Sequence, residues 1–239
     1  MKEYFLSVSV SPLTYEEIIT ELRIRINEEK QSTIIAVNPE KVMTAQKNPE
    51  VKDLINASTF QIADGVGILL ASKLKKGQVK ERVTGVEMMS RLLEFAASDK
   101  LPVYFYGAKE EVVKKAIENI KNDIPNLQVA GYSNGYRKDE KKLVSEIDAS
   151  GAKMIFVALG SPTQELWIKR NIDQLRNVLV FQGVGGSFDV FSGTVKRAPL
   201  FFRKLGLEWF YRLLREPKRL KRQLNLPLFL WKVLRDRGN

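Results

Sequence analysis

The sequence predicts an α/β fold, in which a mostly parallel sheet carries helices on both faces and a basic, amphipathic helical appendage follows at the C-terminus. Short β-rich runs alternate with amphipathic helical stretches over the first 194 residues. Hydrophobic residues make up 44% of the 239 positions, which is enough apolar material for one packed core. Most of the net charge of +11 lies in residues 195–239, so this segment differs in character from the rest.

Six strands are expected, each a short run rich in β-branched and aromatic residues: 33–37, 59–63, 102–106, 127–131, 154–159 and 178–182. Six amphipathic helices are expected at 14–29, 66–75, 86–97, 110–121, 140–149 and 163–175. Alternation of this kind is typical of a Rossmann-like parallel sheet that is covered on both faces. We therefore expect one α/β core at residues 1–194 and a basic, aromatic-rich appendage at 195–239.

The chain contains no cysteine and no histidine, and this excludes several chemistries. Disulfides, thiolate nucleophiles and Cys-ligated zinc are excluded, as are Ser-His-Asp relays and HExxH zinc sites. A general base must then be Asp, Glu, Lys or Tyr, and the carboxylates are the leading candidates. The first residues lack the continuous apolar core of a signal peptide, and no run reaches the roughly 18 apolar residues of a membrane span. We expect a cytoplasmic protein.

The appendage holds 13 basic and three acidic residues, which leaves a net charge of only +1 for residues 1–194. An apolar stripe at helical spacing runs through it, formed by Phe202, Leu205, Trp209 and Leu213. Each basic group near an anionic membrane surface contributes about 1 kcal/mol to binding. The pattern favours docking of the appendage on an anionic membrane surface.

Three other interpretations of the appendage stay open. The stripe could pack on the core while the charges face solvent, or it could pair with a second copy of the chain as a homo-oligomer. The arginines could also contact nucleic-acid phosphates. The sequence has no helix-turn-helix, zinc-finger or RNP-type motif to read bases, so we rank the membrane first and expect no nucleic-acid partner.

Polar residues and glycines follow the predicted strands, where open α/β sheets bind their ligands. The candidate residues there are Asn38, Asp64, Gly107, Gln164, Glu165, Gly185 and Gly186. Three glycine turns lead into helices, whose free N–H groups favour a phosphate, although glycine also serves such turns for purely conformational reasons. Asp64 could equally be a turn or N-cap residue, and Arg82 a solvated loop charge. No P-loop or GxGxxG fingerprint is completed, so neither a Walker-type NTPase nor a standard dinucleotide binder is supported.

In order and spacing, several motifs resemble the WecG/TagA/CpsF glycosyltransferases, also known as glycosyltransferase family 26. In the core these are Asn38-Pro39, Ala63-Asp64-Gly65-Val66-Gly67, Arg82-Val83-Thr84-Gly85, and the segments 158–165, 183–189 and 193–199. In the appendage they are the segments 205–209 and 212–217. The resemblance covers nearly the whole chain. One departure is Ala36, where many members carry Thr or Gly.

The resemblance implies a glycosyltransferase that moves an N-acetylhexosamine from a UDP-sugar donor to a polyprenyl-diphosphate-linked acceptor at the cytoplasmic face of the membrane. The most similar branch builds the linkage unit of wall teichoic acid. It implies transfer of N-acetylmannosamine from UDP to the 4-hydroxyl of GlcNAc-diphospho-undecaprenol, with inversion. The UDP-sugar is a substrate, and no cofactor is expected. The alternative function is a non-catalytic nucleotide-sugar or polyanion (RNA) binding module.

Inverting displacement needs a base for the incoming hydroxyl and charge stabilisation for the departing UDP. The sequence has no DxD metal motif, so we expect metal-independent transfer in which arginines and helix N-termini neutralise the diphosphate. We expect Asp64 to be the base, Arg82 to stabilise phosphate charge and Asn38 to hold the sugar or acceptor. The expected substrate-binding residues are Thr84, Gly107, Gln164, Glu165, Gly185 and Gly186, joined by Arg212, Arg215 and Arg219 when the appendage docks over the site.

Overall fold

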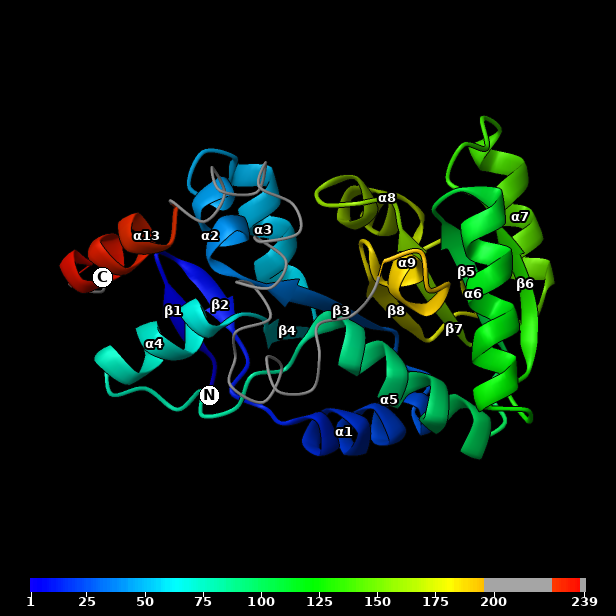
Figure 1. Cartoon of the computed structure of the whole chain (residues 1–239), viewed down its shortest axis with the longest axis horizontal. Coiled ribbons are helices and arrows are strands. Elements are labelled where there is room, and N and C mark those ends of the chain that lie inside the picture. The colour runs from blue at the N-terminus through cyan, green and yellow to red at the C-terminus, as the bar shows by residue number, and fades with distance from the viewer. Residues whose placement is uncertain (196–224, 237–239) are drawn as a thin grey trace.

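A six-stranded sheet with all strands parallel forms the centre of the molecule. The computed structural model describes residues 1–195 and 225–236. The strands are β3 (Ser32–Val37), β4 (Phe60–Ala63), β5 (Val103–Gly107), β6 (Val129–Ser133), β7 (Met154–Ala158) and β8 (Val180–Gly183). They lie in the order β4-β3-β8-β7-β5-β6 (Figure 1). The predicted α/β fold with a parallel sheet is confirmed, and each predicted strand overlaps an observed one.

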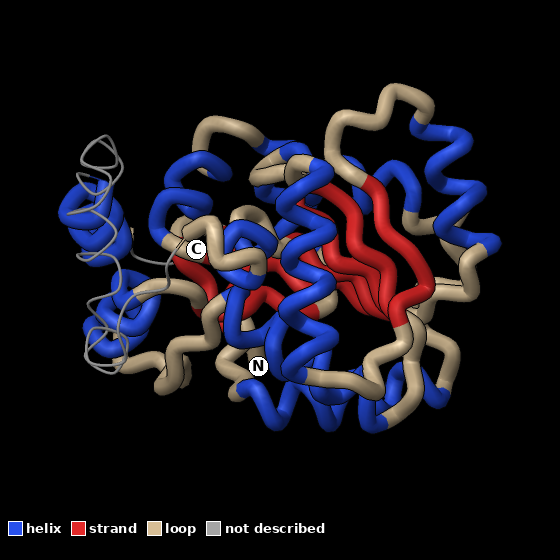
Figure 2. Tube along the Cα trace, turned by 45° about the vertical axis from the view of Figure 1, so that its right-hand side comes forward, coloured by secondary structure: helices blue, strands red, loops and turns tan. Residues whose placement is uncertain are grey.

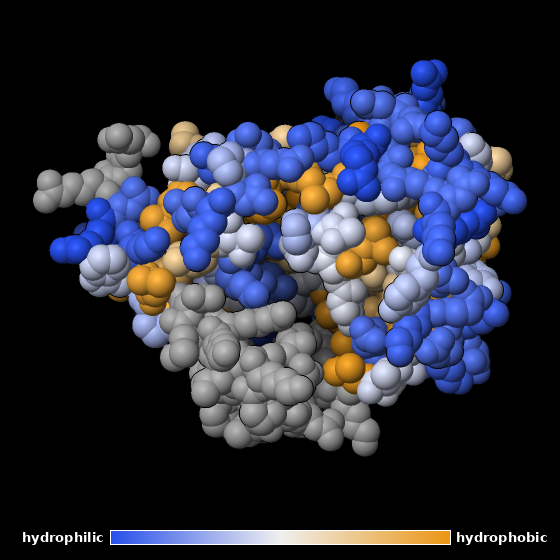
Figure 3. All heavy atoms as spheres, turned by 90° about the horizontal axis from the view of Figure 1, so that it is seen from above, coloured by the Kyte–Doolittle hydropathy of each residue, from blue (hydrophilic) through white to orange (hydrophobic). Residues whose placement is uncertain are grey.

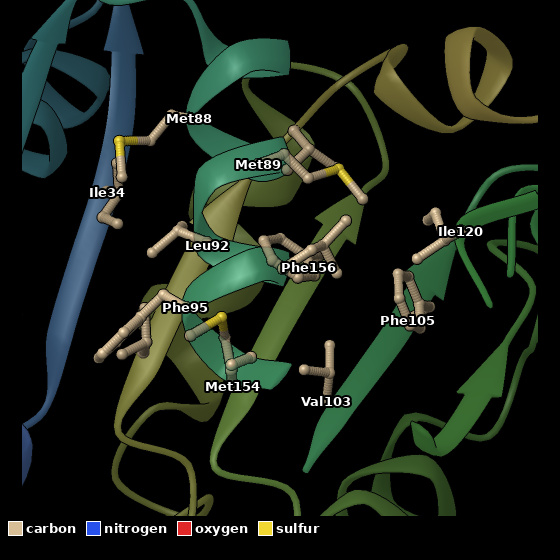
Figure 4. Packing of buried hydrophobic residues seen from close by; sticks show 14 of the residues in the cluster. Ile34, Met88, Met89, Leu92, Phe95, Val103, Phe105, Ile120, Met154 and Phe156 are labelled. Atoms are coloured by element: carbon tan, nitrogen blue, oxygen red, sulfur yellow. The ribbon is translucent and has the colours of Figure 1, made fainter. Parts of the chain in front are cut away.

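One face of the sheet is covered by helices α1 (Tyr15–Asn27), α5 (Gly85–Ser98), α6 (Glu110–Asp123) and α9 (Ser187–Phe191). Helix α5 directs the apolar side chains of Met88, Leu92 and Phe95 at the sheet, at a spacing of one helix face (Figure 4). Met88 and Leu92 are fully buried there. Burial of each such side chain contributes about 1.5–3 kcal/mol, so α5 is held by packing.

The other face carries helices α2 (Pro39–Ala45), α3 (Pro49–Ala57), α7 (Glu140–Ala149) and α8 (Thr163–Asn171). Helices α2 and α3 were not predicted. Each begins with an Asn-Pro pair, in which the asparagine side chain caps the helix and proline takes its first position. Asn38 accepts from the backbone N–H of Lys41 at 2.8 Å, and Asn48 accepts from that of Val51 at 3.2 Å. Proline signals a loop as readily as a helix start, so the pattern was ambiguous.

The β4 edge of the sheet adjoins a small antiparallel hairpin of β1 (Glu3–Phe5) and β2 (Val8–Val10). Helices α4 (Val66–Leu74) and α13 (Asn225–Arg235) lie beside it and stack at this end of the molecule (Figure 2). Phe229 and Val233 of α13 are buried, and the Phe229 ring centroid lies 6.5 Å from that of Phe5. Part of the predicted appendage therefore packs into the core, and the boundary at residue 194 stays a prediction. The predicted stripe at 202–213 lies outside the described residues.

No helix within 1–195 or 225–236 is both long enough and apolar enough to cross a bilayer. Hydrophilic side chains cover the end of the molecule formed by α6 and α7, whereas apolar and charged side chains lie side by side at the α13 end (Figure 3). The two ends of the molecule therefore present different surfaces to their surroundings.

Tyr104 on β5 makes folding sensitive to alkaline pH. Burial first, and then the nearby charge of Glu146, raises the pKa of its phenol to about 12. In the unfolded chain the phenol titrates near pH 10. The contribution of Tyr104 to the free energy of unfolding is therefore fully present below pH 10, and it falls by about 2–3 kcal/mol as the pH rises toward 12. Urea unfolding at pH 9, 10 and 11 should show the first half of this fall, about 1.4 kcal/mol. It should be smaller in Tyr104→Phe, and an equal fall in both proteins would contradict the assignment.

Candidate active site

Two polar residues stand next to each other where neighbouring strands end. Val37 of β3 pairs with Ala63 of β4, so the next residues, Asn38 and Asp64, lie at the same level of the carboxyl edge. The Asp64 backbone N–H donates to the Val37 carbonyl oxygen at 2.9 Å. Gly65 follows with φ of +102°, a left-handed conformation that lets the chain turn beside Asn38. The structure thus brings together two of the three predicted catalytic residues.

Arg82 joins them from the segment that precedes α5. The Val83 backbone N–H donates to the Ala63 carbonyl oxygen at 3.0 Å, which holds this segment against the end of β4. The guanidinium Nη2 of Arg82 lies 3.8 Å from Oδ1 of Asp64, and both side chains are partly buried. A carboxylate and a guanidinium therefore face one small region, an arrangement that suits proton abstraction beside phosphate binding.

Thr84 caps the helix that begins next to Arg82. Its side-chain oxygen accepts from the Glu87 backbone N–H at 3.3 Å and caps helix α5. The neighbouring Gly85 packs near Ala36, with 3.6 Å between the Ala36 Cβ and the position of a Cβ built on Gly85. Thr84 thus fixes the start of α5 next to Arg82, and its predicted contact with substrate stays a prediction.

Tyr15 is a member of this region that the sequence did not single out. Its hydroxyl accepts from the Thr84 backbone N–H at 2.7 Å and donates to the Arg82 carbonyl oxygen at 3.4 Å. Burial raises the pKa of this phenol, and the charges of Glu87 and Asp64 raise it further. The protonated hydroxyl of Tyr15 therefore makes hydrogen bonds to the backbone on both sides of Val83. It lies 67 residues before Arg82, at a helix start where tyrosine is unremarkable, so no local signal pointed to it.

Gln164 and the Gly185-Gly186 turn meet at the ends of β7 and β8. The Gln164 side-chain oxygen accepts from the Gly185 backbone N–H at 2.9 Å. Gly185 has φ of +52°, which favours glycine, and Gly186 is exposed. Gln164 itself is only 3% exposed, so its amide supports the turn from beneath. Substrate contacts of Gln164, Gly185 and Gly186 stay predictions.

Glu165 lies deeper than a substrate-binding side chain usually does. It is 3% exposed, and its Oε1 lies 2.6 Å from Nζ of Lys41, a half-buried residue on α2 that the sequence did not single out.

Gly107 is separated from Asp64 by three intervening strands, a distance on the order of 19 Å. Its φ of +122° and its close approach to the Ala158 backbone give it a conformational role. Substrate contacts of Glu165 and Gly107 stay predictions.

Three further points concern the appendage arginines, metal binding and the nearest large cavity. Arg212, Arg215 and Arg219 lie outside the described residues. In the part of the chain that the structure describes, no three Asp or Glu side chains are grouped so that they could hold a metal ion. A cavity of about 610 Å³ lies near Ser11, Leu13 and Phe60, where β4 begins, away from the carboxyl edge. The chemistry-bearing residues therefore gather at the strand ends, apart from this cavity.

The sequence is similar to a known protein family and to two named relatives. The model of the Glycosyl transferase WecG/TagA/CpsF family matches residues 3–239. A protein of Bacillus spizizenii (strain ATCC 23059 / NRRL B-14472 / W23) is 41% identical over 210 residues, which cover 88% of this chain and 81% of the relative. One of Bacillus subtilis (strain 168) is 39% identical over 214 residues, covering 90% and 83%. Both are named N-acetylglucosaminyldiphosphoundecaprenol N-acetyl-beta-D-mannosaminyltransferase.

Proposed function

Because this chain belongs to the WecG/TagA/CpsF family of glycosyl transferases, we propose that it transfers N-acetylmannosamine from UDP-N-acetylmannosamine to GlcNAc-diphospho-undecaprenol. One observation carries the choice of substrates: both relatives bear this activity in their names, at about 40% identity over nearly nine-tenths of this chain. The Asp64–Arg82 pair supports the chemistry, since it supplies a base and a cation at the edge where open α/β sheets bind ligands.

The proposed reaction is a single displacement with inversion. Asp64 accepts the proton of the acceptor hydroxyl while that oxygen attacks the anomeric carbon of the sugar. The bond from the anomeric carbon to the diphosphate oxygen breaks on the opposite side, and UDP leaves with the electron pair. Arg82 stabilises the charge that develops on the diphosphate, and Asn38 orients the sugar or the acceptor. The Gly185-Gly186 turn contacts uridine or sugar through its backbone.

Product analysis tests this function. Purified protein is incubated with UDP-N-acetylmannosamine and a GlcNAc-diphospho-lipid, with UDP-GlcNAc as the matched donor control. We expect UDP release together with a disaccharide-lipid of the corresponding mass, and little product from the control donor. Nucleotide binding without UDP release would contradict the proposed activity and favour a non-catalytic nucleotide-sugar binding module. Salt-sensitive RNA binding without transfer would favour the polyanion module.

We expect transfer to proceed without a divalent metal. Arg82 supplies positive charge. The first turn of α4 follows Asp64-Gly65 and has no side-chain cap, and the positive end of its helix dipole favours an anionic ligand. Turnover should be unchanged by excess EDTA and should not rise when Mg²⁺ or Mn²⁺ is then restored. A loss of more than tenfold in EDTA, reversed by either metal, would contradict this mechanism.

The enzyme is proposed to act on its lipid-linked acceptor from the cytoplasmic face, bound peripherally to the anionic membrane. The outer sides of α4 and α13 support this and are here called the α4–α13 ridge: Leu70, Leu74, Leu228, Trp231 and Leu234, each at least 40% exposed. The two helices run side by side in the same direction, because Gly67 lies against Leu226 and the Lys75 ammonium lies 3.4 Å from the Asp236 carbonyl oxygen. Exposed apolar residues grouped in this way mark a contact surface.

Basic side chains flank the α4–α13 ridge. Lys73, Lys76 and Arg235 are exposed, and the Arg235 guanidinium lies 4.4 Å from the centre of the Trp231 ring. This excess of positive charge complements anionic lipid, whereas it would repel the same face of a second copy. The ridge therefore favours a lipid surface over a subunit partner.

Flotation with anionic vesicles tests the ridge. Leu74→Ser/Trp231→Ser should bind phosphatidylglycerol vesicles at least tenfold more weakly than the wild type, because the free energy of burying two large apolar groups is lost. Ile24→Ser/Tyr136→Ser, which removes two exposed apolar side chains elsewhere, is the matched control and should bind normally. Equal binding of the ridge variant would exclude the ridge, and a dimer lost only in that variant would assign it to subunit contact. Truncation of the chain after Thr194 would be a poorer test, because it would remove α13 and expose Phe5, on which Phe229 packs.

A further inference from the structure

A buried ion pair bridges two of the segments that follow the strands. Nζ of Lys41 lies 2.6 Å from Oε1 of Glu165, with side-chain exposures of 10% and 3%. Lys41 is on α2, which follows β3, and Glu165 is on α8, which follows β7. In the sheet, β8 lies between β3 and β7. The ion pair therefore spans the end of β8, from which the Gly185-Gly186 turn emerges.

On one side, the pair fixes the orientation of the Gln164 amide. The Gln164 Nε2 donates to Oε1 of Glu165 at 3.1 Å, and this leaves the Gln164 Oε1 to accept from the Gly185 N–H at 2.9 Å. A reversed amide would set oxygen against carboxylate and N–H against N–H. Gly183 makes room for the amide, since a Cβ there would lie 2.6 Å from the Gln164 Nε2. The charge of Glu165 thus selects the one orientation that holds the turn.

On the other side, the pair reaches the proposed catalytic edge. The backbone N–H of Lys41 is the donor that Asn38 accepts at 2.8 Å. Lys41 therefore contacts Asn38 through its backbone and Glu165 through its side chain. One continuous chain of contacts runs from Asn38 to Gly185, across three strand ends.

Stability alone gives little reason for this arrangement. An ion pair removed from water loses most of its Coulomb gain to desolvation, and apolar replacements of the same size are often neutral or stabilising. Oε2 of Glu165 is buried and makes no hydrogen bond within the described part of the chain. A buried group left unsatisfied in this way calls for a reason other than stability, and geometry at the site provides one.

We propose that Lys41 and Glu165 are positioning residues for the donor half of the active site. They hold the Gln164 amide in one orientation, and through it the Gly185-Gly186 turn, at a fixed distance from Asn38. The inference rests on the proposed glycosyl transfer, because it assigns the turn to the nucleotide-sugar. This role requires no contact between either side chain and the substrate.

Two double variants test the proposal, with thermal unfolding and UDP binding by calorimetry as the readouts. Lys41→Met/Glu165→Gln removes both charges at similar volume and lets the Gln164 amide take either orientation. Lys41→Glu/Glu165→Lys keeps an ion pair but places a cation next to the amide, which then reverses and turns its NH₂ toward Gly185. We expect both to unfold within a few degrees of the wild type and to bind UDP at least tenfold more weakly. The KM for the donor should rise, while the KM for the acceptor changes little.

Lys115→Met/Glu118→Gln, on an exposed ion pair of α6, is the matched control and should retain wild-type UDP binding. Gln164→Leu leaves the ion pair in place and should weaken UDP binding to the same extent, so the proposal stays testable if a double variant does not fold. Normal UDP binding in the charge-reversed variant or in Gln164→Leu would overturn the positioning role and leave the proposed function intact. A wild-type protein that does not bind UDP would overturn both.

Discussion

Asp64→Asn is expected to lower kcat by about 10²- to 10⁴-fold while the protein stays folded. An amide of the same shape cannot accept the proton of the attacking hydroxyl, and positioned general bases contribute rate factors of this size. The fold should survive, because the Asp64 side chain is partly exposed and its ion pair with Arg82 is long, at 3.8 Å. Steady-state transfer assays and thermal unfolding of the same preparation measure both effects.

Glu87→Gln is the matched control for this experiment. It neutralises another half-buried carboxylate whose charge acts on Tyr15, at the first turn of α5. It should retain most of the activity, whereas Asp64→Asn should not. If Asp64→Asn turned over within about tenfold of the wild type, the base would have to be another residue.

Gly107→Ala should destabilise the protein by about 3–5 kcal/mol, the largest stability effect expected of one methyl group here. A Cβ at this position would overlap the carbonyl oxygen of Ala158 on the neighbouring strand β7, and the φ of +122° is strained for any L side chain. Backbone strain and overpacking each cost about 1–3 kcal/mol. Urea unfolding gives the difference directly.

Gly151→Ala separates strain from overlap. Gly151 also has a positive φ, +71°, but nothing lies within 4 Å of a Cβ built there, so about 1–2 kcal/mol is expected. The KM of folded Gly107→Ala for the donor should stay close to that of the wild type at low temperature. A raised donor KM with normal stability would instead establish the substrate contact that the sequence suggested.

The fold could be predicted wherever local pattern and tertiary environment agree. The runs that became β3, β5, β7 and β8 are largely buried on both faces and therefore mostly apolar, which makes them recognisable. The hairpin β1–β2 was missed because strands of three residues are too short to show a period. The strand predicted at 127–131 starts at Val129, since Leu127 belongs to the turn that closes α6.

The positions of the candidate residues at strand ends could be predicted from the sequence, but the contacts among them could not. Asn38, Asp64, Gln164 and Gly185 were predicted at the ends of strands, and parallel pairing brings those ends to one edge. The contact between Lys41 and Glu165 joins residues 124 positions apart, and that of Tyr15 with Thr84 joins residues 69 apart. Such contacts depend on how α2 meets α8 and how α1 meets α5, and no spacing along the chain encodes them.

Helix α4 begins directly after Gly65, so a single residue separates Asp64 from the helix that carries the outward leucines. At a rise of about 1.5 Å per residue, Leu70 and Leu74 lie roughly 6 and 12 Å along the axis from the first residue of α4, Val66. When both leucines rest on lipid, the α4 axis runs along the membrane surface, so this distance is measured parallel to the headgroup layer. An enzyme resting on these leucines would find its acceptor by lateral diffusion in two dimensions, while the water-soluble donor arrives in three.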